Sequence, residues 1–226
     1  DSESRLLTIQ KNEIPSRVPS EVHVLSGTPH TEIARFAKET EADLLIIATH
    51  GHSRLKRFFL GSTTERIVRS APCAVLVIRD RRATHQPGLA GLGVVLVATD
   101  FSEGSVAALD RAVELATIAK AEIVLLHVLR DADFPVREVL SRNVWNSVRR
   151  RTQRWLEKLQ ADHTKNTGQS RVLLAEGVPS AKIADAATEQ RAGLIMLGSH
   201  GGSGLKQSLL GTTAERVVRV APCSVY

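Results

Sequence analysis

The sequence predicts an α/β protein built on a doubly wound, five-stranded parallel sheet in two tandem copies, the first of which lacks its N-terminal strands. Three observations lead to this fold class. Apolar runs alternate with amphipathic stretches, the chain repeats itself, and a loop that contains glycines follows the fourth apolar run of the second copy. Strands that alternate with helices are joined by right-handed crossovers, which place parallel strands under helices on both faces.

Short apolar runs predict the strands of the second copy. They are Val94–Ala98, Glu122–Val128, Arg171–Ala175 and Leu194–Leu197, and a fifth strand starts at Cys223. Each run is far shorter than a membrane-spanning helix needs to be. Helices are predicted between them, with Ser102 as the cap of the first, an amphipathic stretch from Val139 to Leu159, a start at Pro179 and a last helix over Thr212–Val220.

The internal repeat has a constant offset of 150 positions, which pairs Gly51 with Gly201, Gly61 with Gly211 and Cys73 with Cys223. It defines a partial domain over residues 1–80, from the end of the second helix through strand five. A linker rich in glycine follows over 81–92, and the second domain covers 93–226. Leu6 and Ile9 match Leu156 and Leu159, so the chain is expected to open inside a helix and to belong to a longer protein.

Composition narrows the setting of the protein. The chain has 226 residues, of which 42% are hydrophobic and 24% charged, a globular balance. It has two cysteines and no secretory signal pattern at its first residues, so we expect a reducing cytoplasm and neither a disulfide framework nor a membrane partner.

The net charge of +6 raises the question of nucleic acid. Much of the excess lies between Arg137 and Arg154, next to Trp145 and Trp155. A basic helix can contact phosphates. The preferred interpretation is a solvated helix face whose tryptophans pack inward, because no base-reading motif accompanies the charge.

The loop after the fourth strand carries the chemistry. It reads Gly198-Ser199-His200-Gly201, then nine residues, then Gly211-Thr212 at the start of the last helix. Glycines let backbone N–H groups come close to phosphate oxygens, and the first turn of a helix offers unpaired N–H donors. Ligands of such sheets bind beyond the carboxyl ends of the strands, where Asp100 ends the first strand. The pattern predicts a phosphate site that is not a P-loop.

This spacing, G-x-x-G-x9-G-[ST], resembles the signature of ATP-binding universal stress proteins, and Gly198, Gly201, Gly211 and Thr212 match it at every position. The segments 97–102, 123–128 and 221–223 are similar to the first strand, second strand and entry to strand five of that family. The resemblance covers 94–226 and, as a partial copy, 1–79. It implies the Rossmann-like, adenine-nucleotide α-hydrolase-like fold.

The resemblance also implies an ATP site. Its residues would be Ala98, Thr99, Asp100, Val128, Leu197, Gly198, His200, Gly201, Gly211, Thr212 and Thr213. Asp100 and the backbone of Val128 would hold the adenosine, and the glycine loop the phosphates. No metal is held directly, although Thr212 can reach a Mg²⁺ or Mn²⁺ ion bound to the nucleotide.

The first copy departs from the pattern. Ala48 replaces the first glycine, and a weaker second site would consist of Gly51, Gly61, Ser62 and Thr63. Counterparts of Asp100 and Val128 would lie before Asp1, so this copy has a phosphate end without an adenine end.

Three functions remain open. The first is a nucleotide-dependent regulatory protein of the stress response, with the two copies paired through their fifth strands, a further homodimer and an unknown protein partner. The second is a slow ATPase or a related adenine-nucleotide enzyme, for which His200 is the only candidate base. The third is an interaction module without nucleotide. Glu215 and Arg216 are expected to form a surface pair on the last helix.

Overall fold

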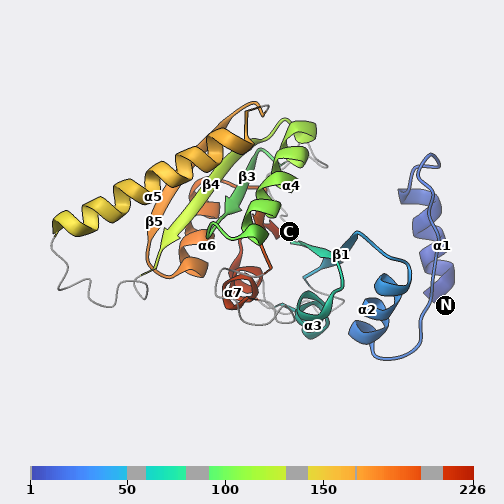
Figure 1. Cartoon of the computed structure of the whole chain (residues 1–226). Coiled ribbons are helices and arrows are strands. Elements are labelled where there is room, and N and C mark those ends of the chain that lie inside the picture. The colour runs from blue at the N-terminus through green and yellow to red at the C-terminus, as the bar shows by residue number, and fades with distance from the viewer. Residues whose placement is uncertain (1, 50–59, 80–91, 131–141, 166, 200–210) are drawn as a thin grey trace.

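The computed structural model describes residues 2–49, 60–79, 92–130, 142–165, 167–199 and 211–226. In these ranges the first copy forms α1 (Ser2–Glu13), α2 (Pro29–Glu39), β1 (Leu44–Ala48), α3 (Ser62–Ser70) and β2 (Ala74–Ile78). The second copy forms β3 (Val94–Ala98), α4 (Glu103–Ala119), β4 (Glu122–Leu129), α5 (Arg142–His163), β5 (Ser170–Glu176), α6 (Pro179–Glu189), β6 (Leu194–Leu197), α7 (Thr212–Val220) and β7 (Ser224–Val225). Figure 1 shows these elements arranged around one sheet.

One seven-stranded sheet runs through both copies in the order β1-β2-β7-β6-β3-β4-β5. The five strands of the second copy are parallel to one another, as predicted. The chain runs from β3 outward to β5 and then returns to the other side of β3, where it forms β6. This reversal opens a crevice at the carboxyl ends of β3 and β6, the place where sheets of this kind bind ligands.

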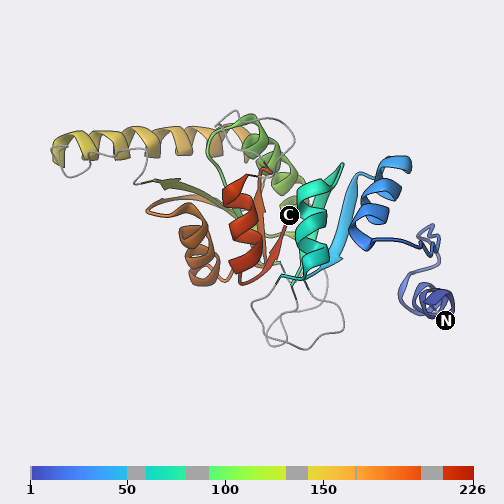
Figure 2. The same ribbon diagram turned by 90° about the horizontal axis from the view of Figure 1, so that it is seen from below.

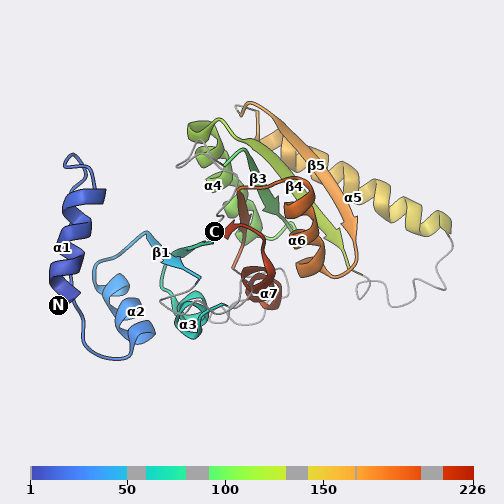
Figure 3. The ribbon, with the colours of Figure 1, turned by 180° about the vertical axis from the view of Figure 1, so that it is seen from behind.

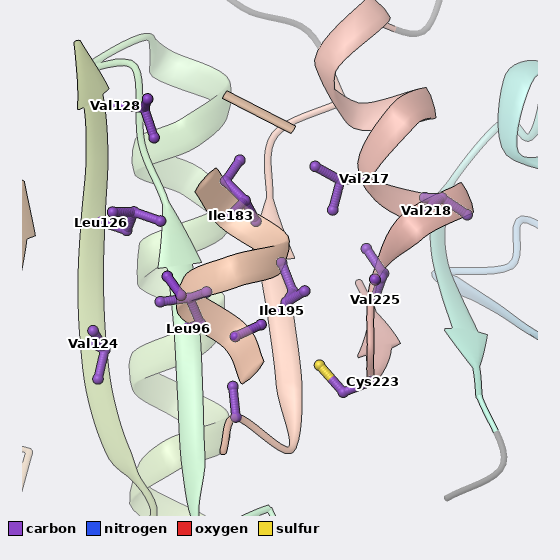
Figure 4. Packing of buried hydrophobic residues seen from close by; sticks show 14 of the residues in the cluster. Leu96, Val124, Leu126, Val128, Ile183, Ile195, Val217, Val218, Cys223 and Val225 are labelled. Carbon is purple, nitrogen blue, oxygen red and sulfur yellow. The ribbon is translucent and has the colours of Figure 1, made fainter. Parts of the chain in front are cut away.

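Helices cover both faces of the second copy, because alternate strand residues point to opposite sides of the sheet. Val95 and Val97 face α4 and α5, whereas Leu96 faces α6 and α7. Figures 1 and 3 show these two layers from opposite sides. Figure 4 shows the second layer from close by, where Leu96 and Ile195 of the sheet lie near Ile183 of α6.

The predicted elements of the second copy agree with the structure. The bounds of β3, β6 and α7 are those expected from the sequence, α6 starts at Pro179, and Ser102 caps α4 by accepting a bond from the Ser105 N–H. The start of the long amphipathic stretch, Val139, and all of the predicted linker except Leu92 lie outside the described residues. Within the described ranges, no helix combines the length and the apolar character that crossing a bilayer requires.

The first copy is less complete. The match of Leu6 with Leu156 correctly predicts the helix α1, yet Leu6 is 39% exposed and Leu156 is fully buried. Residues 21–25, the counterpart of β5, form no strand. β5 is hydrogen-bonded to β4, and among the described residues of the first copy no equivalent of β4 pairs with residues 21–25.

The two copies are joined through their fifth strands, because Val77 of β2 pairs with Val225 of β7 in antiparallel orientation. The helices α3 and α7 lie side by side next to this joint (Figure 2). Arg69 of α3 donates to Glu215 at 2.6 Å, and Arg219 of α7 donates to Glu65 at 2.7 Å. The hydrogen bond with Glu215 raises the pKa of Arg69.

These contacts correct one expectation. The sequence predicts a pair of Glu215 with Arg216, but Glu215 forms ion pairs with Arg69 and, one turn along α7, with Arg219. Arg79 adds a further link, since its guanidinium donates to the Val218 carbonyl in the last turn of α7 at 3.0 Å. Burial lowers the pKa of Arg79. The pairing of the copies therefore rests on strand, ion-pair and capping contacts together.

Candidate functional site

A cavity of about 370 Å³ lies at the carboxyl ends of β3, β4 and β6. Nine of the eleven residues predicted for the ATP site line it, namely Ala98, Thr99, Asp100, Val128, Leu197, Gly198, Gly211, Thr212 and Thr213. The other two, His200 and Gly201, lie outside the described residues. Residues separated by more than a hundred positions thus meet in one crevice.

A tight turn presents Asp100 at the edge of the cavity. Phe101 has a φ of 65°, in the left-handed region that residues with side chains seldom adopt. The Ser102 N–H donates to Asp100 Oδ1 at 3.1 Å, and the Ser102 hydroxyl donates to the same oxygen. Ser102 thus provides a hydrogen-bonding partner for the Asp100 carboxylate, which still lines the cavity.

Buried hydroxyls hold this turn from below. Thr99 Oγ1 and Ser105 Oγ lie 2.9 Å apart, and Thr99 Oγ1 also accepts from the Phe101 N–H at 3.0 Å. The Thr99 carbonyl lies 2.8 Å from His127 Nδ1. Because a carbonyl only accepts, Nδ1 carries the proton in this pair. The network fixes the end of β3 and the start of α4 as one unit.

His127 of β4 belongs to both this network and the cavity wall. Besides its bond to Thr99, its ring lies 4.7 Å from that of Phe101, and the residue lines the cavity. Arg130 lines the cavity as well, and neither residue was predicted for the site. Leu126, Val128 and Arg130 share one face of β4 and its extension, so a period of two starting from Val128 would have found the other two.

The start of α7 forms the opposite wall. Gly211 is its N-cap, and no side chain caps the helix there. The Gly211 N–H donates to the Ser199 carbonyl at 2.7 Å, which holds the end of the loop. The N–H groups of the first turn, at Thr212 and Thr213, have no acceptor within the helix and carry the positive end of its dipole. This wall is suited to an anion.

Gly198 has a packing role that the sequence did not reveal. A Cβ atom built on it would lie 2.8 Å from the Gly104 carbonyl carbon and 2.9 Å from the Ser105 nitrogen. The first turn of α4 therefore lies directly against the end of β6. In the first copy the equivalent Ala48 is exposed, because this chain has no helix equivalent to α4 there.

The proposed weaker second site is only partly described. Gly61 caps α3 as Gly211 caps α7, and its N–H donates to the Thr49 carbonyl at 2.9 Å. Ser62 and Thr63 form the first turn of α3, and Gly51 lies outside the described residues. The hydrogen bond that holds the end of the loop at Gly211 thus has an equivalent at Gly61. Among the described residues of the first copy, the adenine wall has no equivalent.

Neither cysteine is among the described residues that line this cavity. Cys223 is fully buried in the core, and burial raises the pKa of Cys73. Among the described residues, no group of three or more histidine, cysteine or acidic side chains is placed to hold a metal ion.

Comparison with known proteins identifies the family. A profile described as "Universal stress protein family" matches residues 2–79 and 92–226. The curated universal stress protein YxiE of Bacillus subtilis is 34% identical over 140 residues, which cover 58% of this chain and 95% of YxiE. The universal stress protein MJ0577 of Methanocaldococcus jannaschii is 24% identical over 141 residues, or 55% of this chain and 87% of MJ0577.

Solved structures agree. That of MJ0577 superposes with a TM-score of 0.54 at 26% identity, covering 59% of this chain and 93% of MJ0577. A putative universal stress protein from Pseudomonas aeruginosa superposes with a TM-score of 0.71 at 21% identity, over 100% of this chain and 77% of that protein, so it shares the fold across both copies. From the profile match over both copies, together with the shared fold, the chain belongs to the universal stress protein family.

Proposed function

We propose that the second copy binds ATP and that the protein acts as a nucleotide-dependent regulator in the stress response. One observation carries the proposal. The nine described residues of the predicted site line a single cavity whose walls combine a carboxylate, strand-end backbone and a helix N-terminus. Its volume of about 370 Å³ falls in the range of small-molecule pockets.

Each wall suits one part of the nucleotide. The first-turn N–H groups of α7 would donate to phosphate oxygens, and Thr212 would reach a phosphate or its bound Mg²⁺ or Mn²⁺. Asp100, held by Ser102, would accept from a ribose hydroxyl. The backbone of Val128 would contact the adenine, with Leu126 and Ile183 as apolar neighbours in the cavity wall. The metal ion would neutralise phosphate charge.

Regulation is favoured over catalysis by the state of the cavity wall. His127 is the one imidazole among the described lining residues, and its Nδ1 proton is donated to the Thr99 carbonyl. This bond orients the ring and leaves Nε2 as its acceptor, but efficient phosphoryl transfer also needs several charge clamps, and Arg130 is the one cationic side chain of the described lining. A slow ATPase is the alternative that turnover measurements address.

The decisive experiment compares two glycines that cap equivalent helices. Gly211 and Gly61 have ordinary extended angles, φ −61° and −63°, so valine is compatible with the backbone φ and ψ at both. We expect Gly211→Val to abolish ATP binding in calorimetry with Mg²⁺, whereas Gly61→Val retains it. Denaturing the purified wild-type protein should release adenine nucleotide, detected by absorbance and mass.

Unchanged ATP affinity in Gly211→Val, with a folded circular dichroism spectrum, would refute the site. If Gly61→Val lost ATP binding and Gly211→Val did not, the ATP site would lie in the first copy. Steady release of phosphate by the wild type, lost in Asp100→Ala, would establish the ATPase instead. If the protein bound no nucleotide at all, the remaining candidate function would be an interaction module without nucleotide.

Two further parts of the proposal concern the setting. We propose that two chains associate as a homodimer, which light scattering after size exclusion would test. Both cysteines are free thiols, which is compatible with the reducing cytoplasm predicted from the sequence. A search for the protein partner of this regulator should compare the protein in the presence and in the absence of ATP.

A further inference from the structure

The first half of α5 has an unusual charge distribution. Five arginines lie between its start and Leu156, at positions 142, 149, 150, 151 and 154, and the first acidic residue of the helix is Glu157. The first turn of α5 contains no acidic residue. Cations near a helix N-terminus oppose the helix dipole, and like charges one turn apart repel, as Arg150 and Arg154 do. The clustered arginines therefore lower the stability of this helical segment, which indicates that they have a function.

A groove runs beside these arginines. It has a volume of about 490 Å³ and is lined by Arg149, Arg150, Gln153 and Arg154 of α5 and by Leu174 of β5. β5 is the edge strand of the sheet. Figures 1 and 2 show the N-terminal half of α5 projecting beyond this edge. The groove therefore lies on the outside of the molecule, away from the crevice between β3 and β6.

The arginines of the groove are only partly neutralised. Arg149 forms an ion pair with Glu176 at 2.8 Å. Arg150 donates to the Ser147 hydroxyl at 3.3 Å. In the portion of the chain that is described, neither Arg150 nor Arg154 has a carboxylate partner. Two guanidinium groups one helical turn apart thus face the solvent on the same side of α5.

The expected inward packing of the tryptophans is only partly correct. Trp155 is 52% exposed, and the Arg151 guanidinium lies 5.2 Å from its ring centroid. Neither residue lines the groove. Among the described lining residues no aromatic ring is present on which a base could stack, and Leu174 is the only apolar side chain. The groove offers charge without a hydrophobic anchor.

We infer that this groove binds the phosphate backbone of a nucleic acid without reading its bases. Guanidinium groups bind phosphate oxygens in a bidentate manner, and a polyanion binds by releasing counterions, which needs no apolar anchor. An acidic protein partner fits less well, because stable protein interfaces centre on buried aromatic or aliphatic anchors. The interaction does not depend on the proposed ATP site.

The test measures fluorescence anisotropy of labelled twelve-nucleotide oligo-dT and oligo-dA with the full chain between 50 and 200 mM salt. Each phosphate contact to a single strand contributes about −0.7 to the slope of log K against log salt. The two arginines without a carboxylate partner among the described residues, Arg150 and Arg154, predict a slope of about −1.4, so the fourfold rise in salt weakens binding roughly 7-fold. Equal affinity for the two oligonucleotides, within about twofold, is expected of contacts to phosphate alone.

The variant Arg150→Gln/Arg154→Gln should make the slope shallower by about 1.4 while leaving ATP binding unchanged. The matched control is Arg5→Gln/Arg17→Gln, which removes the same charge from exposed positions in and after α1. An equal loss in the control would overturn the inference, since it would show attraction by net charge alone. Strong preference for one base, or for poly-glutamate over both oligonucleotides, would overturn it as well.

Discussion

Substituting Gly198 by alanine tests how closely α4 lies against β6. The added Cβ would lie 2.8 Å from the Gly104 carbonyl carbon, 2.9 Å from the Ser105 nitrogen and 3.0 Å from the Gly104 oxygen. Carbon atoms in favourable contact are about 3.5–4.0 Å apart, so the first turn of α4 must move by roughly 0.7 Å or more. All three obstructing atoms belong to the backbone, which cannot rotate away as a side chain can.

Overpacking of this kind costs about 1–3 kcal/mol of unfolding free energy. For a chain of this size, each kcal/mol corresponds to about 2–4 °C, so the Tm of Gly198→Ala should fall by roughly 2–12 °C. Urea unfolding followed by circular dichroism gives the free energy directly, with an unchanged slope if the denatured state is the same. Because Ser105 is bonded to Thr99, we also expect weaker ATP binding.

The control is the reverse substitution in the first copy, Ala48→Gly. Ala48 is exposed, so losing its methyl group should cost no more than about 1 kcal/mol. If Gly198→Ala were as stable as the wild type, the close approach of α4 to β6 would be wrong. If both substitutions destabilised the protein equally, the contrast between a covered and an uncovered strand end would be wrong.

Three other predictions concern the joint and the thiols. Arg69→Ala and Glu215→Ala should each lower the urea midpoint, and the loss in the double mutant should be smaller than the sum of the two single losses, because their shared ion pair is lost only once; additive losses would contradict the ion pair. Arg79→Met should lower the free energy of unfolding by about 1–3 kcal/mol, because the last carbonyls of α7 lose a charged donor; an unchanged urea midpoint would exclude this contact. Since burial raises the pKa of Cys73, less thiolate is present at pH 8 than in free cysteine, so iodoacetamide should react more slowly, with a gap that narrows as pH rises. Cys223 should react only in denaturant, and its labelling in the native protein would contradict its burial.

Strands β3, β4 and β6 were predictable because each is an apolar run buried on both faces. Val94–Ala98 illustrates this, since its bounds follow from composition alone. The cavity wall was predictable where a pattern of glycines or a strand end marks it, as at Gly211 and Asp100.

The features that could not be predicted from the sequence depend on contacts between distant segments. The clash at Gly198 involves Gly104, which no local pattern connects with it. The partner of Glu215 lies 146 positions away, so a neighbouring arginine seemed the obvious choice. Residues 21–25 repeat the sequence of a strand, yet strand formation requires a hydrogen-bonding neighbour rather than a suitable composition.

The shared sheet has a consequence for the order of folding. Of the buried hydrophobic side chains, the first copy contributes only Ala37, Ile67 and Val77 among the described residues. Val77 is buried against the core of the second copy. So small a core cannot offset the entropy of ordering its own chain. Residues 93–226 should therefore fold first, and β2 and then β1 should pair with the sheet that they have formed. Amide hydrogens of the first copy should accordingly exchange with solvent before those of β3 and β4.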